Sequence, residues 1–351
     1  MHTLPGAGSV RSVSCGAADN CLAVSSANTT ALAESWDGTA WQVHPTPRLP
    51  VTRGQMPQML LDGVSCTSFR GCVAVGASDT YNGNGSVLTL SGSAILVETW
   101  NEVAWKVTNT PSPADSLLYA VSCKGSFCMA VGGTQGQGYS LSPLAVTGKG
   151  TAWTVQSLPA QGHQTYLKGV SCPSVQLCVA VGTFNNSLNS TATALVWAGT
   201  SWRTQILPVL AGVSSASLSD VSCTSVTACT AVGSYILRTE STRSLPLVET
   251  WNGTTWRTQP SPALAASAMG TGLDGISCPS PGICTAVGYS GSNALIETED
   301  GSPWQIAQDS STLGSVHSLN FLNAVSCYSA TDCVATGTTD AGSAFSEVKH
   351  S

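Results

Sequence analysis

Two aspartates, Asp62 and Asp274, occupy equivalent places in a segment that the chain repeats, each two residues before a repeated Val or Ile. Two carboxyl groups about 5 to 10 Å apart can hydrolyse a glycosidic bond, one as acid and the other as base or nucleophile. The two copies are not adjacent, so their aspartates could meet only near the axis of a ring. We expect Asp62 and Asp274 to be the catalytic residues if the protein is a glycosidase or lyase.

The other copies carry different residues at this place. In chain order the seven positions hold Arg11, Asp62, Tyr119, Lys168, Ser219, Asp274 and Asn323. An asymmetric ligand requires such a varied set of charges, donors and acceptors, so we expect a binding site where these strands enter the mouth of an axial channel. The alternative is a solvated rim whose polar residues only confer solubility.

Long connections surround these positions and add polar residues, as binding loops do. They are 49–61 with Arg53, 78–93 with Asp79 and Tyr81, 161–167 with His163 and Tyr166, 234–246 with Arg238, Glu240 and Arg243, and the connection with His317 before the last copy. The aspartate of the run 79–85 is one place out of register with a calcium loop, so we expect no metal or cofactor.

Fourteen cysteines fall into seven close pairs: Cys15 and Cys21, Cys66 and Cys72, Cys123 and Cys128, Cys172 and Cys178, Cys223 and Cys229, Cys278 and Cys284, and Cys327 and Cys333. Zinc ligand pairs usually have two to four intervening residues, and the chain has only five histidines, none at a fixed place in the repeat. Two cysteines facing each other across a hairpin can instead form a disulfide. We expect seven disulfides, each within its own copy, and an oxidising compartment.

The first cysteines of successive pairs are 49 to 57 residues apart, which is the length of one four-stranded propeller blade. In each copy the first strand ends as in Val64–Cys66 and the second contains a run such as Val73–Gly76. The third and fourth resemble 247–251 and 256–260. The sequence therefore predicts an all-β fold, a seven-bladed β-propeller with four-stranded antiparallel blades.

We expect a single monomeric domain over residues 1–351. Its blades should span 9–47, 60–113, 117–160, 167–210, 218–262, 272–308, and 320–351 together with 2–8. The last copy stops after its third strand, and the N-terminal residues 2–5 resemble the end of a fourth strand. We therefore expect both termini to share the last blade, which would leave the ring without an open edge.

A short hairpin joins the third and fourth strands, with Asp37-Gly38, Asn252-Gly253 or Asp300-Gly301 at its tip. Such dipeptides favour a two-residue turn, which would place Glu34 directly opposite Trp41. The segment from Ser35 to Trp41 resembles the Asp-box of sialidase-type (BNR) propeller repeats. That resemblance implies a propeller fold without implying activity, because the box is structural in the family and neither the arginine triad nor the tyrosine nucleophile of sialidases can be placed here.

Several recurring residues are open to a functional or a structural interpretation. A glutamate recurs in the third strand as Glu34, Glu98, Glu249, Glu297 and Glu347. Five copies around a ring cannot all be one catalytic acid, so we expect buried carboxylates bonded to an indole N–H or to backbone of a neighbouring blade. The tryptophans could stack on sugars, but their strand positions favour packing between blades. The serine before each first cysteine lacks an activating His or Asp and should be structural.

The amino-acid composition argues against two classes of binding partner, nucleic acid and anionic membranes. Only 9% of the residues are charged, and the 13 Lys and Arg are scattered at a net charge of -6, so no basic patch indicates nucleic acid or an anionic membrane. No apolar run is long enough for membrane insertion, and the first residues lack the pattern of a signal peptide, so an exported chain would be the mature form.

Three functions fit these observations. We expect first a secreted, lectin-like recognition module that binds an extracellular glycan or protein on the loop-rich face of the propeller, and not an enzyme. The first alternative is a carbohydrate-active glycosidase or lyase that uses the two aspartates. The second is a structural or adhesive surface protein without a defined pocket.

Overall fold

The computed structural model describes residues 2–6, 8–27, 29–50, 55–68, 71–83, 88–136, 141–159, 164–186, 189–240, 243–262, 270–309, 320–339 and 344–349. Within these residues every regular element is a strand, and the strands pair into seven four-stranded antiparallel sheets. The predicted all-β propeller with four-stranded antiparallel blades is confirmed. We number the blades 1 to 7 in the chain order of their innermost strands.

The first four blades follow one pattern, from the innermost to the outermost strand. Blade 1 contains β2 (Ser9–Ala17), β3 (Asn20–Ala27), β4 (Thr30–Trp36) and β5 (Trp41–Pro45). Blade 2 contains β6 (Gln55–Ser68), β7 (Gly71–Gly83), β8 (Leu88–Trp100) and β9 (Trp105–Val107). Blade 3 contains β10 (Ser116–Lys124), β11 (Phe127–Gln135), β12 (Leu141–Lys149) and β13 (Ala152–Val155). Blade 4 contains β14 (Thr165–Ser174), β15 (Leu177–Asn185), β16 (Ser190–Trp197) and β17 (Trp202–Gln205).

The remaining blades repeat the pattern, except that the last one takes its outermost strand from the N-terminus. Blade 5 contains β18 (Val213–Ser225), β19 (Ala228–Leu237), β20 (Ser244–Trp251) and β21 (Trp256–Gln259). Blade 6 contains β22 (Thr271–Ser280), β23 (Ile283–Ser290), β24 (Asn293–Asp300) and β25 (Gln305–Asp309). Blade 7 contains β26 (Asn320–Cys327), β27 (Cys333–Thr339), β28 (Ala344–Lys349) and β1 (His2–Thr3).

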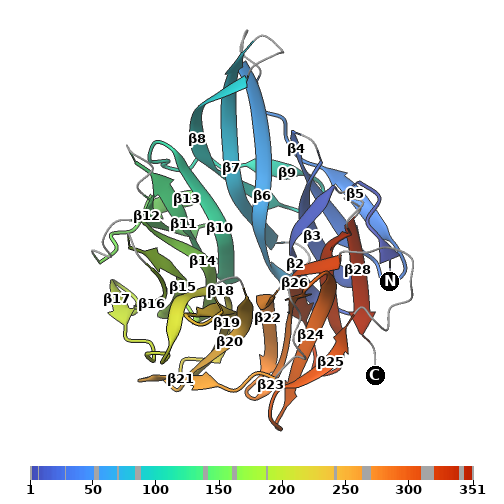
Figure 1. Ribbon diagram of the computed structural model, residues 1–351. Helices are drawn as coiled ribbons and strands as arrows, with labels where there is room; N and C mark the ends of the chain where they lie inside the picture. Colours follow the sequence, from blue (N-terminus) through green and yellow to red (C-terminus); the bar gives the residue numbers. More distant parts are fainter. Residues whose placement is uncertain are drawn as a thin grey trace.

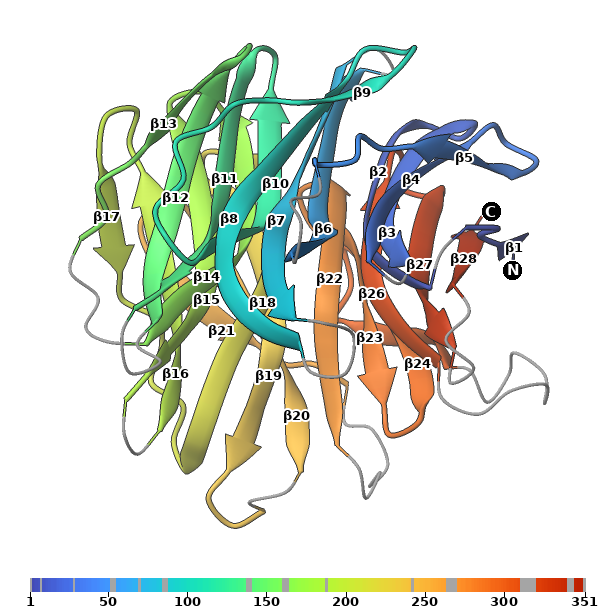
Figure 2. The same cartoon turned by 90° about the horizontal axis from the view of Figure 1, so that it is seen from above.

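The innermost strands surround a common axis (Figure 1). Each contacts the innermost strand of the next blade, in the order β2, β6, β10, β14, β18, β22 and β26, and β26 in turn contacts β2. His2 of β1 pairs with Ser346 of β28, so the two ends of the chain meet in one sheet. In the perpendicular view both termini lie at the same side of the molecule (Figure 2).

Blade 2 is longer than the sequence indicates. Its first strand begins at Gln55 rather than at residue 60, and most of the segment 78–93, expected as a loop, belongs to β7 and β8. Asp79 pairs with Ser93 in this extension, and its Oδ1 accepts a hydrogen bond from the Ser93 hydroxyl at 2.6 Å. Strands β6, β7 and β8 project beyond the neighbouring blades at the top of Figure 1. Residues 84–87, between β7 and β8 in the sequence, lie outside the described part of the chain.

All seven predicted cysteine pairs form disulfides, each between the first and second strand of one blade. Their Cα atoms are 4.0 to 4.1 Å apart. Each bond therefore closes a short hairpin and does not join different blades. The connections between blades depend on other interactions.

The serine before each first cysteine makes such a connection. Its hydroxyl oxygen accepts a hydrogen bond from the backbone N–H of the first cysteine in the next blade, at 2.9 to 3.0 Å. The donors and acceptors are Cys66 and Ser14, Cys123 and Ser65, Cys172 and Ser122, Cys223 and Ser171, Cys278 and Ser222, Cys327 and Ser277, and Cys15 and Ser326. The last bond joins blade 7 to blade 1, so these serines link all the blades in a closed circle. The expectation that they are structural agrees with these contacts.

The tryptophans pack as core residues, at 3 to 7% exposed. In four blades the two tryptophans of the outer hairpin pair directly, with ring centroids 5.5 to 5.8 Å apart. The two-residue turn predicted between them is wrong. Trp36 pairs with Trp41 around a four-residue loop, so Glu34 lies opposite Val43. The Asp37 carboxylate holds this wider loop, because its Oδ1 accepts the backbone N–H groups of Thr39 and Ala40 at 2.9 Å.

Four of the recurring glutamates are buried, and their partners agree only in part with those expected. Glu34 accepts the backbone N–H of Gly6 at 2.9 Å, and both carboxylate oxygens of Glu297 accept from the Ser261 hydroxyl. Glu98 is fully buried without a hydrogen-bond partner among the described residues. Among the described side chains no indole donates to these carboxylates. Burial raises the pKa of Glu34. It raises the pKa of Glu98 to about 8 and the pKa values of Glu249 and Glu297 to about 7. The side chain of Glu347 lies outside the described part.

The serine circle predicts the effect of removing one hydroxyl. We expect Ser122→Ala to lower the free energy of unfolding by about 1–3 kcal/mol, because the Cys172 N–H loses its acceptor. Ser157→Ala, at an exposed serine, is the control and should change it by less than about 0.5 kcal/mol. Denaturant unfolding without reductant measures both. Equal stability of the two variants would contradict a linking role for the serine.

The buried carboxyl of Glu98 predicts a pH dependence of stability. Its folded pKa of about 8 lies above the ordinary value of 4.5, so the folded state holds the proton more tightly and the free energy of unfolding falls as pH rises between these values. Glu98→Gln cannot ionise, so it should match the parent near pH 5 and exceed it near pH 9. Melting temperatures across this range, with the surface variant Glu240→Gln as control, provide the measurement. Parallel curves for Glu98→Gln and its parent would refute the assignment.

Candidate functional site

A β-bulge occurs at the same place in the innermost strand of every blade. The pairing register shifts at Arg11, Asp62, Tyr119, Lys168, Ser219, Asp274 and Asn323. These are the seven positions selected from the sequence, and we call them the axial residues. They lie inside the strands, at the third residue or later, rather than at the strand entrances as expected. A bulge redirects one side chain while its neighbours stay in register.

The residues that flank each bulge explain its position. The preceding residue is fully buried: Val10, Leu61, Leu118, Leu167, Leu218, Leu273 or Leu322. In blades 2 to 7 this leucine pairs with a glycine of the second strand, such as Gly76 or Gly182. A Cβ atom on Gly76 would lie 2.0 Å from the Leu60 carbonyl oxygen, so only glycine fits at this place in blade 2. Blade 1 has Ser25 at the equivalent place, opposite Val10. This recurrent glycine is the sequence signal of the bulge, and the sequence analysis did not use it.

The residue after each bulge faces the next blade at close range. A Cβ atom on Gly63 would lie 2.9 Å from the Ala120 Cα, and one on Gly169 would lie 2.7 Å from the Asp220 Cα. Asp220 itself occupies this place in blade 5 and was missed by the sequence analysis. Its carboxylate accepts the N–H of Val221 at 2.8 Å and that of Ile276, in blade 6, at 3.0 Å. Asp220 therefore joins two blades beside the axial residues, and burial raises its pKa to about 6 despite these two donors.

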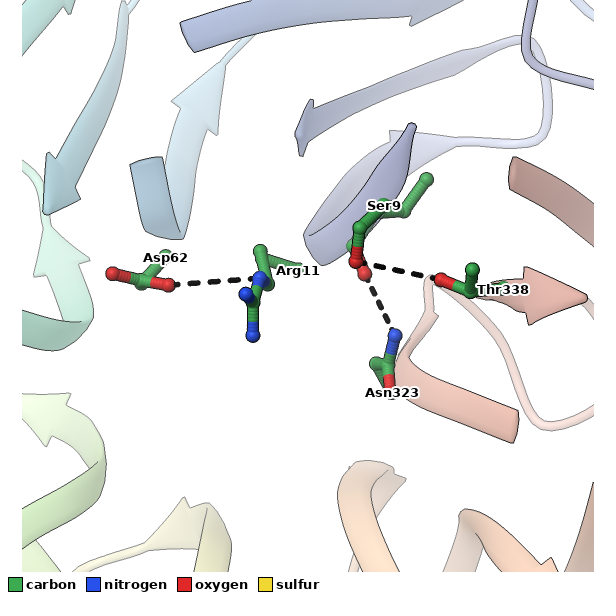
Figure 3. Close-up of polar contacts among 6 residues, drawn as sticks. Ser9, Arg11, Asp62, Asn323 and Thr338 are labelled. Atoms are coloured by element: carbon green, nitrogen blue, oxygen red, sulfur yellow. Dashed lines mark hydrogen bonds and ion pairs between the residues drawn. The ribbon is translucent and has the colours of Figure 1, made fainter. Parts of the chain in front are cut away.

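One pair of axial residues carries opposite charges. The Nε atom of Arg11 lies 3.9 Å from Oδ1 of Asp62, and the two side chains are 51% and 19% exposed. Figure 3 shows both side chains pointing into the space between the inner strands. Burial raises the pKa of Asp62 to about 6, against the lowering effect of the Arg11 charge, and the Asp79 charge raises it further. A ligand can compete for this weakly paired, partly exposed couple.

Three further axial residues, Tyr119, Lys168 and Asp274, belong to a second group of interacting side chains that includes Tyr166. The Lys168 ammonium lies 5.7 Å from the ring centre of Tyr166, and the Tyr166 and Tyr119 rings are 6.2 Å apart. Burial raises the pKa of Asp274 to about 6, and the Lys168 charge lowers it. Burial also raises the pKa of Tyr119, and the charge of Asp62 raises it further. Aromatic and charged side chains from blades 2, 3, 4 and 6 therefore act on one another around the axis.

Asp62 and Asp274 are influenced by different charged residues. The cation that acts on Asp62 is Arg11, whereas the one that acts on Asp274 is Lys168. The acid that raises the pKa of Asp62 is Asp79 of the same blade. Both acids nevertheless titrate near pH 6, where an acid or base catalyst would operate.

The other residues expected at the site lie in different surroundings. Asn323 donates a hydrogen bond to the Val10 carbonyl at 2.8 Å, so it is partly used in joining blade 7 to blade 1 (Figure 3). Arg53, His163 and His317 lie outside the described residues. Arg243 pairs with Glu240 at 3.1 Å on the surface. Asp79 and Tyr166, which are not at bulges, also act on the axial residues.

The described residues contain no group of three His, Cys, Asp or Glu side chains placed to hold a metal ion. They also contain no helix of the length and apolarity needed to cross a membrane.

No protein-family model matches the chain, and no curated protein matches its sequence. Its fold does match solved structures over almost its whole length. YCF48 bound to a D1 peptide is 12% identical with a TM-score of 0.58, covering 99% of this chain and 94% of that chain. YCF48 from Cyanidioschyzon merolae is 11% identical with a TM-score of 0.58, covering 99% and 97%.

A third structure is Sqt1 from Chaetomium thermophilum bound to the N-terminus of the ribosomal protein L10. It is 9% identical with a TM-score of 0.52 and covers 99% of each chain. At these identities the likeness shows a shared fold. The chain is therefore a β-propeller similar in architecture to propellers that have been solved with protein segments bound.

Proposed function

We propose that the protein is a secreted recognition module that binds a segment of an extracellular protein at the axial residues. The observation that carries this proposal is the recurrent bulge, which presents six different residue types from the seven blades on an otherwise repetitive scaffold. Arg11, Lys168, Asp62 and Asp274 supply both signs of charge, and Tyr119 supplies an aromatic surface. Such a mixture suits a polypeptide, which offers charged side chains, amides and apolar groups together.

Two other observations support parts of this proposal. Seven disulfides are of use in an oxidising compartment, which supports secretion. Two propellers with the same architecture were solved with a D1 peptide and with the N-terminus of a ribosomal protein. A glycan is the second candidate ligand, because few surface residues are charged and both titrating aspartates lie among the axial residues.

The proposal predicts which substitutions abolish binding. Peptides are selected from a displayed random library on the immobilised protein, and their affinities are measured by calorimetry. We expect Arg11→Ala combined with Lys168→Ala to weaken the selected peptides at least about tenfold, because two charged contacts are lost. Arg203→Ala combined with Arg257→Ala, on the exposed outermost strands, is the matched control and should leave affinity unchanged.

A glycan array and a panel of glycoside substrates are tested in parallel. Glycan binding that depends on Arg11 and Lys168, with no peptide selected, would replace the protein ligand by a glycan. Hydrolysis that is lost in both Asp62→Asn and Asp274→Asn would replace recognition by catalysis.

The two axial aspartates predict a pH dependence of the same binding. Both are ionised above pH 6 and neutral below it, so the axial residues become more positive as pH falls from 7 to 5. A selected peptide with a net positive charge should bind more weakly at pH 5, and one with a net negative charge more tightly. The double variant Asp62→Asn with Asp274→Asn should remove this dependence. A pH profile that survives in the double variant would show that the peptide does not contact these residues.

A further inference from the structure

A groove of about 340 Å³ lies between blades 4 and 5, away from the axial residues. Its apolar lining includes Ala192 of β16, Leu207 and Leu210 of the connection between the blades, and Leu247 of β20; Arg238 and Glu249 also line it. A second hollow of about 400 Å³ shares Leu210 and Leu247 with it. The two hollows together are large enough for more than one side chain of a ligand.

The carboxyl of Glu249 is incompletely bonded. Glu249 is 2% exposed; its Oε1 accepts from the Thr258 hydroxyl at 2.9 Å, and its Oε2 has no partner among the described residues. At the equivalent place Glu34 Oε1 and Glu297 receive donors from Gly6 and Ser261, which belong to the chain leading into their blades. Oε2 of Glu34 and both carboxylate oxygens of Glu98 have no partner among the described residues. The Thr258 donor of Glu249 comes from its own sheet instead. A ligand N–H in the groove would supply the donor that the connection into blade 5 does not.

The open side of the groove carries a cation. Arg238 is exposed, and its Nε donates to the Val213 carbonyl at 3.2 Å, which fixes the direction of the guanidinium. Its terminal nitrogens have no hydrogen bond or ion pair with any described residue. Fixed guanidinium donors of this kind suit a carboxylate.

Apolar residues at the surface extend the same site. Val209, which also lines the groove, is 95% exposed. Ile206, on the same connection, is 92% exposed. The groove therefore combines an apolar hollow, an acceptor on a buried carboxyl and a carboxylate-binding cation.

We propose that this groove binds the C-terminal residue of a peptide with an apolar side chain. The side chain would occupy the hollow beside Leu207, Leu210 and Leu247, the last amide N–H would donate to Oε2 of Glu249, and the terminal carboxylate would accept from Arg238. Charge and hydrogen-bond complementarity select this occupant, because the last residue of a peptide carries all three groups on adjacent atoms. A free N-acylated amino acid shares the same chemistry.

N-acetyl-leucine and acetyl-Ala-Ala-Leu are the probes, and ligand-observed NMR titration is the measurement. We expect N-acetyl-leucine to bind with a dissociation constant on the order of 1 mM, as its size allows. The tripeptide should bind more tightly, since the adjoining hollow offers it further contacts. N-acetyl-leucinamide lacks the carboxylate, N-acetyl-N-methylleucine lacks the amide N–H, and each should bind at least about tenfold more weakly. Binding of N-acetyl-leucine without any binding of the tripeptide would overturn the peptide assignment.

Variants assign the binding to the groove. Glu249→Met and Arg238→Gln should each weaken the tripeptide at least about tenfold while the melting temperature shows that the variants fold. Glu34→Met, the same change at the equivalent place in blade 1, and Arg257→Gln are matched controls and should bind normally. The variant Arg11→Ala with Lys168→Ala should also bind the tripeptide normally, so failure at the axis and failure in this groove are separable. Unchanged affinity in both Glu249→Met and Arg238→Gln would overturn the proposal.

Discussion

The circle of hydrogen bonds from cysteine N–H groups to serine hydroxyls is the constraint on which the rest of the structure depends. Each disulfide holds only one hairpin, whereas each serine links its blade to the next. The bond from Cys15 to Ser326 connects the two ends of the series, so the first and last blades have the same neighbours as all others. Because the serine stands directly before the cysteine, one three-residue run, Val-Ser-Cys or in blade 6 Ile-Ser-Cys, supplies a core residue, a link between blades and a disulfide. A repeat can therefore vary widely elsewhere and still join the ring.

At the bulge, residues that are required for packing lie next to a residue that can vary between blades. Leu167 before the bulge fills the core and Gly182 opposite it accommodates the close backbone, so neither can change size without a clash or a cavity. Lys168, at the bulge itself, has no register partner on β15. A redirected side chain on a strand is held more firmly than one on a loop, so the axial residues gain rigidity from the scaffold without being needed for its stability. Asp220 is an exception. The equivalent residue in the other blades is small, whereas the Asp220 carboxylate accepts a hydrogen bond that joins blades 5 and 6.

The sequence predicted the features that one residue type at a fixed interval can encode. Paired cysteines define the number and the limits of the hairpins, and the alternation around them defines the strands. The prediction from the sequence was wrong where a residue is compatible with two local backbone geometries. Asp37 and Gly38 are compatible with a two-residue turn, but the carboxylate of Asp37 caps a four-residue loop, which moved Glu34 from Trp41 to Val43. It also failed in blade 2, where the polar segment 78–93 continues the sheet because Asp79 and Ser93 satisfy each other across the strands. The axial residues were found because they vary in an otherwise regular run, while their bulge was not, because its signal lies in a glycine of the next strand.

Both candidate sites follow from places where the repeat is incomplete or unequal. At the axis the blades differ in one side chain, so seven equivalent positions give a surface without sevenfold symmetry. At blade 5 the connection from blade 4 does not give Glu249 the kind of donor that Gly6 and Ser261 give to Glu34 and Glu297. The surrounding sheets are closed and covalently pinned, so a ligand at either place meets groups that are already oriented and loses little free energy to reorganising them. In a protein made of near-identical units, the departures from identity are the places where a partner can be recognised.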